Sequence, residues 1–205
     1  MISGKILGTD FFKRDTVEVA KNLLGKKIIR NISGNFFCAK IVETEAYLGL
    51  SDRACHSYGG NITKRNEILY REGGTIYVYL IYGMYNLFNI VTRDEGEPEA
   101  VLIRAVEPIE NIDGIAINRF GKNFKNLSTY QRKNLTNGPG KLAMALSIDR
   151  SLNGKILSKD YLFIEDGEKV NNIVTAKRIG IDYAGEDANL PLRFYIGDNP
   201  YVSVK

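Results

Sequence analysis

Hydrophobic and polar residues alternate along several stretches of the chain, which predicts a protein rich in β-strands. Residues 75–92 combine β-branched and aromatic side chains with few charges and no proline, as strands do. Gly83 lies near the centre of this stretch and tolerates the unusual backbone angles that a tight turn requires. We therefore expect a β-hairpin whose turn contains Tyr82, Gly83 and Met84.

The first arm of this hairpin places Tyr77 and Tyr79 on one face, because successive side chains of a strand point to opposite sides. A tyrosine in a strand usually packs in or around the core, and two on one face can also form a stacking wall. The pattern leaves both interpretations open. Tyr82 is harder to explain as a core residue, since turns lie at the surface, and it therefore indicates a function.

Other patterns predict the remaining elements. Residues 15–18 resemble a capping box that opens a short helix ending at Gly25. Two further helices are expected at 109–117 and after Lys141, whereas 118–137 reads as poorly specified surface. Strands are predicted at 26–30, 35–47, 100–106, 161–165, 172–178, 192–196 and 201–204. This order indicates an α+β fold with a largely antiparallel sheet in a single domain, residues 1–205.

Two acidic residues interrupt the apolar strand that ends in IVETEAY. Alternation would place Glu43 and Glu45 on one face with Ile41 and Tyr47. One interpretation is an edge strand whose acids point to water. The other is a carboxylate held beside Tyr47 in a cleft and made basic enough to activate water, and the pattern does not decide which acid would act. Arg104, inside another apolar strand, needs an anionic or carbonyl partner if it is buried, and Glu45 is one candidate.

Composition narrows the classes of function. The 205 residues are 44% hydrophobic with a formal net charge of +4, which suits one folded domain and is compatible with a nucleic-acid partner. We find no run of about eighteen apolar residues, no signal-peptide core and only two cysteines, so we expect a soluble cytoplasmic monomer. His56 and its neighbour Cys55 lack zinc-site spacing, and no phosphate loop or nucleophile elbow is present. We predict neither a metal nor a cofactor.

Several segments together resemble the alkyladenine (methylpurine) DNA glycosylases, base-excision repair enzymes of the mammalian type that bacteria also have. The resembling segments cover nearly the whole chain and are long enough to be specific. They are IVETEAYLG at 41–49, ACHS at 54–57, GTIYVYLIYGMYNLFNI at 74–90, VLIRAVEP at 101–108, NGPGKLAMAL at 137–146, and AKRIGIDYAGEDA with PLRFYIGDNPYVSV near the end. The resemblance implies a single mixed α+β domain around a curved, largely antiparallel β-sheet with a protruding β-hairpin.

The resemblance also implies catalytic roles. Glu45 matches the general base that activates water for attack on the sugar C1′ atom, and Arg104 matches a partner that helps to hold this water. Tyr82 matches the residue that intercalates into the duplex after the damaged base has been flipped out. Glu43 falls within the motif, and we expect it to be structural.

Five residues match the family's base pocket. A flipped purine would stack between Tyr47 on one side and His56 with Tyr79 on the other, with Tyr77 at the border. Asn89 matches the residue that crowds the exocyclic amino group of guanine and rejects the normal base. Electron-poor alkylated purines should stack well on such electron-rich rings.

The implied partner is double-stranded DNA that contains damaged purines. Candidate contacts to its backbone are Lys64, Arg65, Gly140 and Lys141. The match assigns no lysine nucleophile, which indicates hydrolysis of the N-glycosidic bond to an abasic site without strand cleavage. Two alternatives are a non-enzymatic nucleic-acid binder that uses the tyrosines as a stacking platform and a carbohydrate hydrolase with Glu43 and Glu45 as its acid pair.

Overall fold

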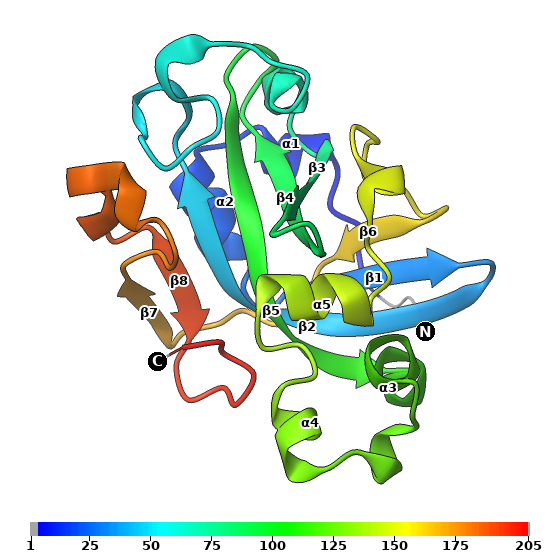
Figure 1. Cartoon of the computed structure of the whole chain (residues 1–205). Helices are drawn as coiled ribbons and strands as arrows, with labels where there is room; N and C mark the ends of the chain where they lie inside the picture. The colour runs from blue at the N-terminus through cyan, green and yellow to red at the C-terminus, as the bar shows by residue number, and fades with distance from the viewer. Residues whose placement is uncertain (1–3, 205) are drawn as a thin grey trace.

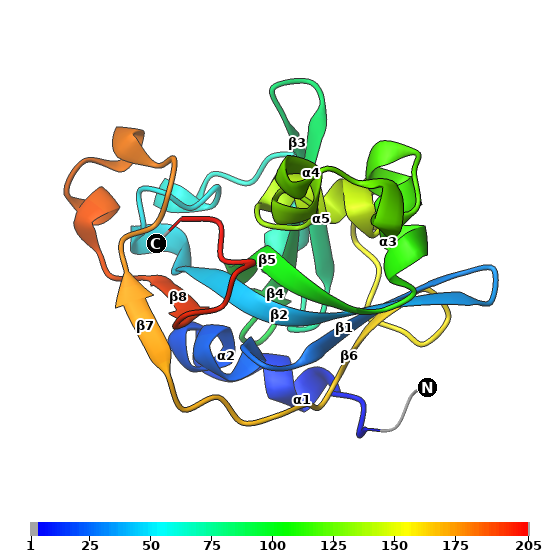
Figure 2. The same ribbon diagram turned by 90° about the horizontal axis from the view of Figure 1, so that it is seen from below.

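The computed structural model describes residues 4–204 and contains one curled antiparallel sheet with helices on both sides (Figures 1 and 2). The strands are β1 Lys27–Ile32, β2 Asn35–Tyr47, β3 Ile76–Ile81, β4 Tyr85–Thr92, β5 Glu99–Glu110, β6 Leu162–Glu165, β7 Ile173–Ala176 and β8 Arg193–Ile196. Their order is β3-β4-β5-β2-β1-β6, with β8 paired to β2 and β7 to β8. The predicted α+β fold with a curved, largely antiparallel sheet is confirmed.

Helices pack on both sides of the sheet and cover the core. The α-helices are α1 Thr9–Phe12, α2 Thr16–Leu23, α3 Ile112–Phe120, α4 Thr129–Lys133 and α5 Pro139–Ala145. Short 3-10 helices are η1 Gly49–Ser51, η2 Tyr58–Gly60, η3 Glu67–Tyr70, η4 Phe124–Asn126, η5 Arg150–Leu152 and η6 Asp182–Asn189. Figure 2 shows α1 and α2 on one side of the sheet and α3 to α5 on the other. The predicted capping residue, Asp15, accepts a hydrogen bond from the Glu18 amide and begins α2.

A β-bulge at Val42 breaks the alternation of β2. Ile41 pairs with Val106 and Glu43 with Ala105, so Val42 has no partner on β5. Ile41 consequently lies in the main core, whereas Glu43 and Glu45 lie on the other face of the strand. The prediction that Ile41 shares a face with the two acids is wrong, because simple alternation cannot anticipate an inserted residue.

The β3–β4 hairpin protrudes from the sheet, as predicted (Figure 2). The Met84 amide donates a hydrogen bond to the Ile81 carbonyl at 3.1 Å. Tyr82 and Gly83 have φ angles of 51° and 69°, so two consecutive residues of the turn are left-handed, as in type I′ turns. Tyr82 therefore shares the unusual geometry that we expected of Gly83 alone, and its side chain is 87% exposed.

Two predictions about irregular segments need correction. Residues 118–137 lie largely at the surface, as predicted, but they contain the end of α3, all of η4 and α4, and two leucines, Leu127 and Leu135, that are buried in the main core. These two leucines hold the segment against the core, although its polar composition indicated a surface stretch without defined structure. Residues 201–204 form no strand, and the Ser203 amide instead donates to the Glu43 carboxylate at 2.7 Å.

Candidate active site

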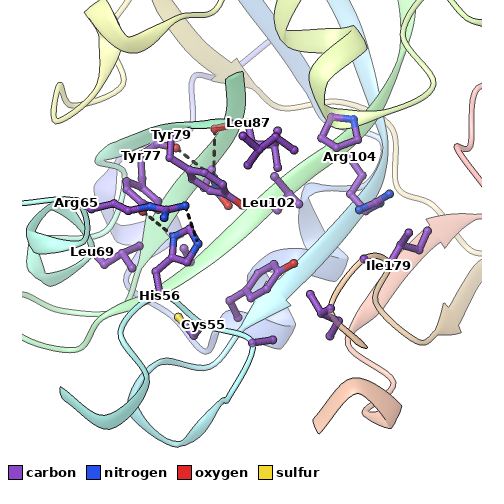
Figure 3. Close-up of a pocket in the computed structure, with 18 of the residues that line it drawn as sticks. Cys55, His56, Arg65, Leu69, Tyr77, Tyr79, Leu87, Leu102, Arg104 and Ile179 are labelled. Carbon is purple, nitrogen blue, oxygen red and sulfur yellow. Dashed lines mark hydrogen bonds between the residues drawn. The ribbon is translucent and has the colours of Figure 1, made fainter. Parts of the chain in front are cut away.

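A cavity of about 560 Å³ opens beside the hairpin, between the segment that follows β2, the segment that follows β7 and the start of α5 (Figure 3). This volume is typical of small-ligand sites. The residues predicted from the sequence that line it are Tyr47, His56, Arg65, Tyr77, Tyr79, Tyr82, Asn89 and Arg104. The fold thus gathers side chains from β2, β3, β4, β5 and the loop after β2 around one space.

Glu45 lies directly behind this lining and is completely buried. The Ile179 amide donates to its Oε1 atom at 2.8 Å, and the Tyr47 hydroxyl donates to its Oε2 atom at 2.9 Å. Arg104 Nη1 lies 3.2 Å from Oε1, which confirms the predicted ion pair. Burial raises the pKa of Glu45 above its ordinary value, although Arg104, Ile179 and Tyr47 each stabilise the charged form. A carboxylate with a raised pKa is suited to accept a proton near neutral pH.

Glu43 occupies a different environment. Its carboxylate accepts hydrogen bonds from Arg193 Nη1 at 2.8 Å, from Arg104 Nε at 3.2 Å, and from the amide and hydroxyl of Ser203. It does not line the cavity. Four donors occupy its oxygens, so Glu43 anchors β8 and the following segment to β2. Both acids contact Arg104 of the cavity lining, but Tyr47 and Ile179, which also line the cavity, bind Glu45.

The aromatic wall of the cavity is formed by His56, Tyr77 and Tyr79. The ring centroids of His56 and Tyr79 lie 4.5 Å apart in an edge-on arrangement, and those of Tyr77 and Tyr79 lie 5.3 Å apart. The Tyr77 hydroxyl and His56 Nδ1 are hydrogen-bonded at 2.8 Å. Burial and the nearby Arg65 lower the pKa of His56 to about 4, so its imidazole is neutral near pH 7. This wall therefore offers neutral, electron-rich rings to a ligand.

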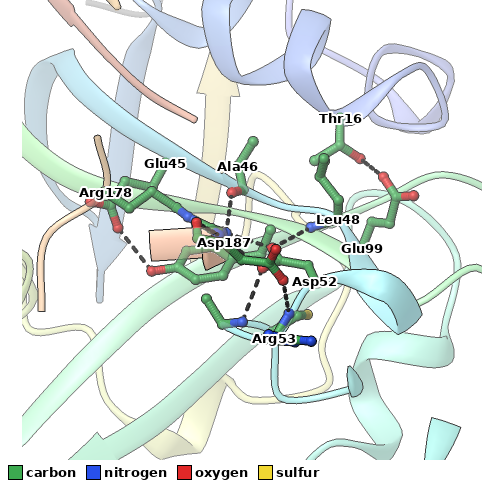
Figure 4. A network of polar contacts seen from close by, with 12 residues as sticks. Thr16, Glu45, Ala46, Leu48, Asp52, Arg53, Glu99, Arg178 and Asp187 are labelled. Carbon is green, nitrogen blue, oxygen red and sulfur yellow. Dashed lines mark hydrogen bonds and ion pairs between the residues drawn. The ribbon is translucent and has the colours of Figure 1, made fainter. Parts of the chain in front are cut away.

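A buried ion pair supports Tyr47 on the other side of the cavity (Figure 4). Arg178 donates to both carboxylate oxygens of Asp52, at 2.5 and 2.8 Å, and to the Ala46 carbonyl at 3.0 Å. Its guanidinium carbon lies 4.7 Å from the centroid of the Tyr47 ring. Asp52 and Arg178 were not predicted from the sequence, because nothing local relates residues so far apart. The next residue, Ile179, provides the amide that binds Glu45.

Comparison with known proteins shows the family of the chain. The family model described as "Methylpurine-DNA glycosylase (MPG)" matches residues 10–200. The chain belongs to this family. A protein of Clostridium novyi named "Putative 3-methyladenine DNA glycosylase" is 55% identical over 201 residues, covering 98% of this chain and 100% of its own length. A protein of the same name from Desulfitobacterium hafniense is 52% identical over 202 residues, again covering 98% and 100%.

Membership of the methylpurine-DNA glycosylase family makes the chain a DNA repair enzyme with DNA as its substrate. The fold places the family-matched Asn89 on β4, where its Nδ2 atom donates to the Tyr77 carbonyl at 3.2 Å and the Leu87 carbonyl at 3.4 Å. These bonds fix the side-chain amide at the cavity wall.

The four candidate DNA-backbone residues lie in different surroundings. Lys64 is exposed, whereas Arg65 lines the cavity. Gly140 packs beneath Tyr85, where an added Cβ atom would be 3.0 Å from the ring, so close packing of α5 on the hairpin explains this glycine. Lys141 Nζ donates to the side chains of Asn134 and Asn137. Their contacts with DNA remain predictions.

Within residues 4–204, no group of three or more His, Cys, Asp and Glu side chains is arranged to hold a metal ion. No helix in this described part of the chain is long and apolar enough to cross a membrane.

Proposed function

We propose that this protein is a monofunctional DNA glycosylase that removes alkylated or deaminated purines. The proposed substrates are 3-methyladenine, 7-methylguanine, hypoxanthine and ethenoadenine, each flipped out of the duplex before its N-glycosidic bond is hydrolysed. The observation that carries the proposal is a fully buried carboxylate, Glu45, directly behind a cavity walled by aromatic rings. The product is an abasic site.

Glu45 acts as the general base in this proposal. A water molecule donates a proton to its carboxylate while the oxygen attacks the sugar C1′ atom, and the departing base carries away the bonding electrons. Tyr47 keeps its proton, because burial raises the pKa of its hydroxyl well above the ordinary value, and it continues to donate to Glu45. Arg104 holds the carboxylate in its charged form. The same negative charge stabilises an oxocarbenium-like transition state.

The absence of a candidate nucleophile supports hydrolysis without strand cleavage. Among the described residues that line the cavity there is no lysine, and so none is available to form a Schiff base with the sugar. The base would stack between Tyr47 and the wall of His56 and Tyr79, with Asn89 beside its edge. Tyr82, exposed on the hairpin turn, would fill the gap left in the duplex.

The test is base release from a duplex oligonucleotide that carries one hypoxanthine. Half of each sample is treated with hot alkali, which cuts abasic sites, and half is left untreated. Release of 7-methylguanine, whose own ring hot alkali opens, is measured instead as the free base. We expect wild type to give fragments only after alkali. Glu186→Gln, which changes an exposed acid, serves as a control and should be as active as wild type. Fragments without alkali would contradict the monofunctional assignment. Intact DNA in both halves, with duplex binding retained, would instead support the stacking-platform alternative.

A further inference from the structure

Arg65 lies against the aromatic wall of the cavity although its side chain is exposed (Figure 3). Its guanidinium carbon is 5.5 Å from the centroid of the Tyr79 ring, and its Nη2 atom is 3.4 Å from His56 Nε2. The residue comes from the loop that precedes η3, so it approaches the wall from the rim. The family-matched stacking residues and an arginine thus share one surface.

The contact with Arg65 determines how His56 is protonated. A guanidinium can only donate hydrogen bonds, so His56 Nε2 must accept and carry no proton. The remaining proton lies on Nδ1, which donates to the Tyr77 hydroxyl at 2.8 Å. Burial and Arg65 together lower the pKa of His56, which agrees with this neutral form. His56 therefore contributes no charge to the wall.

Arg65 differs from the other arginines around the cavity. Arg104 is neutralised by Glu43 and Glu45, and Arg178 by Asp52. Within residues 4–204, Arg65 forms no ion pair with a carboxylate. Among the described residues, no carboxylate in an ion pair therefore offsets its positive charge beside Tyr79.

We propose that Arg65 determines lesion specificity, by favouring neutral damaged purines over cationic ones. The inference rests on the glycosylase function proposed above. A base stacked on Tyr79 would lie next to the guanidinium, and a cationic base such as 7-methylguanine would be repelled and would compete for the same electron-rich ring. A neutral base such as hypoxanthine meets no such repulsion and offers acceptor atoms to the guanidinium.

This role differs from the DNA-backbone contact expected from the sequence, and the two make different predictions. A phosphate contact strengthens the binding of every duplex equally. Its loss therefore weakens the binding of all lesion-containing duplexes alike and reduces the salt dependence of binding. A charge at the base pocket changes the ratio of rates between lesions. Only the ratio distinguishes the two roles.

The experiment compares single-turnover release of 7-methylguanine and hypoxanthine by wild type, Arg65→Gln, Arg65→Lys and Lys64→Gln. We expect Arg65→Gln to raise the ratio of the 7-methylguanine rate to the hypoxanthine rate about tenfold, which corresponds to about 1.4 kcal/mol. Arg65→Lys keeps the charge and should keep the ratio near that of wild type. Lys64→Gln removes the same charge one residue away and serves as the matched control, with an unchanged ratio.

Two results would overturn the inference while leaving the glycosylase function intact. One is an unchanged ratio in Arg65→Gln, and the other is an equal change in Lys64→Gln, which would indicate a general effect of charge on DNA binding. Failure of wild type to release either base would refute the proposed function itself, and the inference with it. Because Arg65 is exposed, misfolding of its variants does not complicate the comparison.

Discussion

Replacing Tyr82 by asparagine separates the function of the hairpin turn from its stability. Tyr82 adopts a left-handed conformation with a φ angle of 51°, which is unfavourable for a bulky side chain. Asparagine tolerates this conformation, and Asn-Gly is the preferred sequence of a type I′ turn. The substitution therefore improves the local fit of the backbone while it removes the aromatic ring.

The expected change in stability follows from exposure and backbone geometry. Tyr82 is 87% exposed, so losing its small buried area, about 20 Å², costs only about 0.5 kcal/mol. Relief of the left-handed conformation contributes about 1 kcal/mol in the opposite direction. The melting temperature of Tyr82→Asn should therefore equal that of wild type or exceed it by about 1–2 °C.

The expected change in activity is opposite in sign. If the ring replaces the flipped base in the stack, its loss removes about 1–3 kcal/mol of stacking, which corresponds to a rate reduction of about five- to 150-fold. Single-turnover release of hypoxanthine measures this reduction, and Tyr82→Phe, which keeps the ring, should remain active. A parallel loss of melting temperature and activity in Tyr82→Asn would refute the reasoning, because it would mean that the ring packs in the fold.

Three further predictions concern buried charges. Glu43→Gln leaves Arg104 and Arg193 without their shared carboxylate and should lower the free energy of unfolding by about 3–5 kcal/mol in urea titration; an unchanged value would show that Glu43 is not structural. The pKa of His56 is about 4 in the folded protein against an ordinary 6.5, so the unfolded chain binds this proton first as the pH falls. Stability should therefore decrease by up to about 3 kcal/mol between pH 6.5 and 4, and His56→Gln should lose this part of the pH dependence of thermal melting. Because the pKa of Glu45 is raised, the rate of hypoxanthine release should increase with pH and level off, with an inflection above the ordinary value of 4.5; an inflection below it would contradict the assignment of the base.

The sequence predicted the elements that depend on local chemistry. The hairpin turn followed from Gly83, and the face shared by Tyr77 and Tyr79 followed from alternation, which holds where a strand has no bulge. Alternation failed in β2 at Val42, because a bulge depends on pairing with β5 and not on residues nearby. Likewise, local sequence could not predict the structure of residues 118–137, because Leu127 and Leu135 pack against distant helices and strands.

The two acids of β2 illustrate what the pattern could not decide. Glu43 and Glu45 stand two residues apart, and strand alternation alone treats them as equivalent, although the family resemblance assigns the base to Glu45. Arg193 and Ser203, both far along the chain, bind Glu43, whereas Tyr47 and Ile179 connect Glu45 to the cavity. The distinction between the two carboxylates arises only when remote segments pack together.

The most direct test of the account compares Glu45→Gln with wild type on a duplex that contains one hypoxanthine. Glutamine keeps the shape of the side chain and removes the base, so single-turnover release should fall by about 10²- to 10⁴-fold. Duplex binding should remain close to that of wild type, and the variant should remain folded, since Arg104 keeps its ion pair with Glu43. Retention of the wild-type rate by a folded Glu45→Gln would contradict the assignment of Glu45 as the general base.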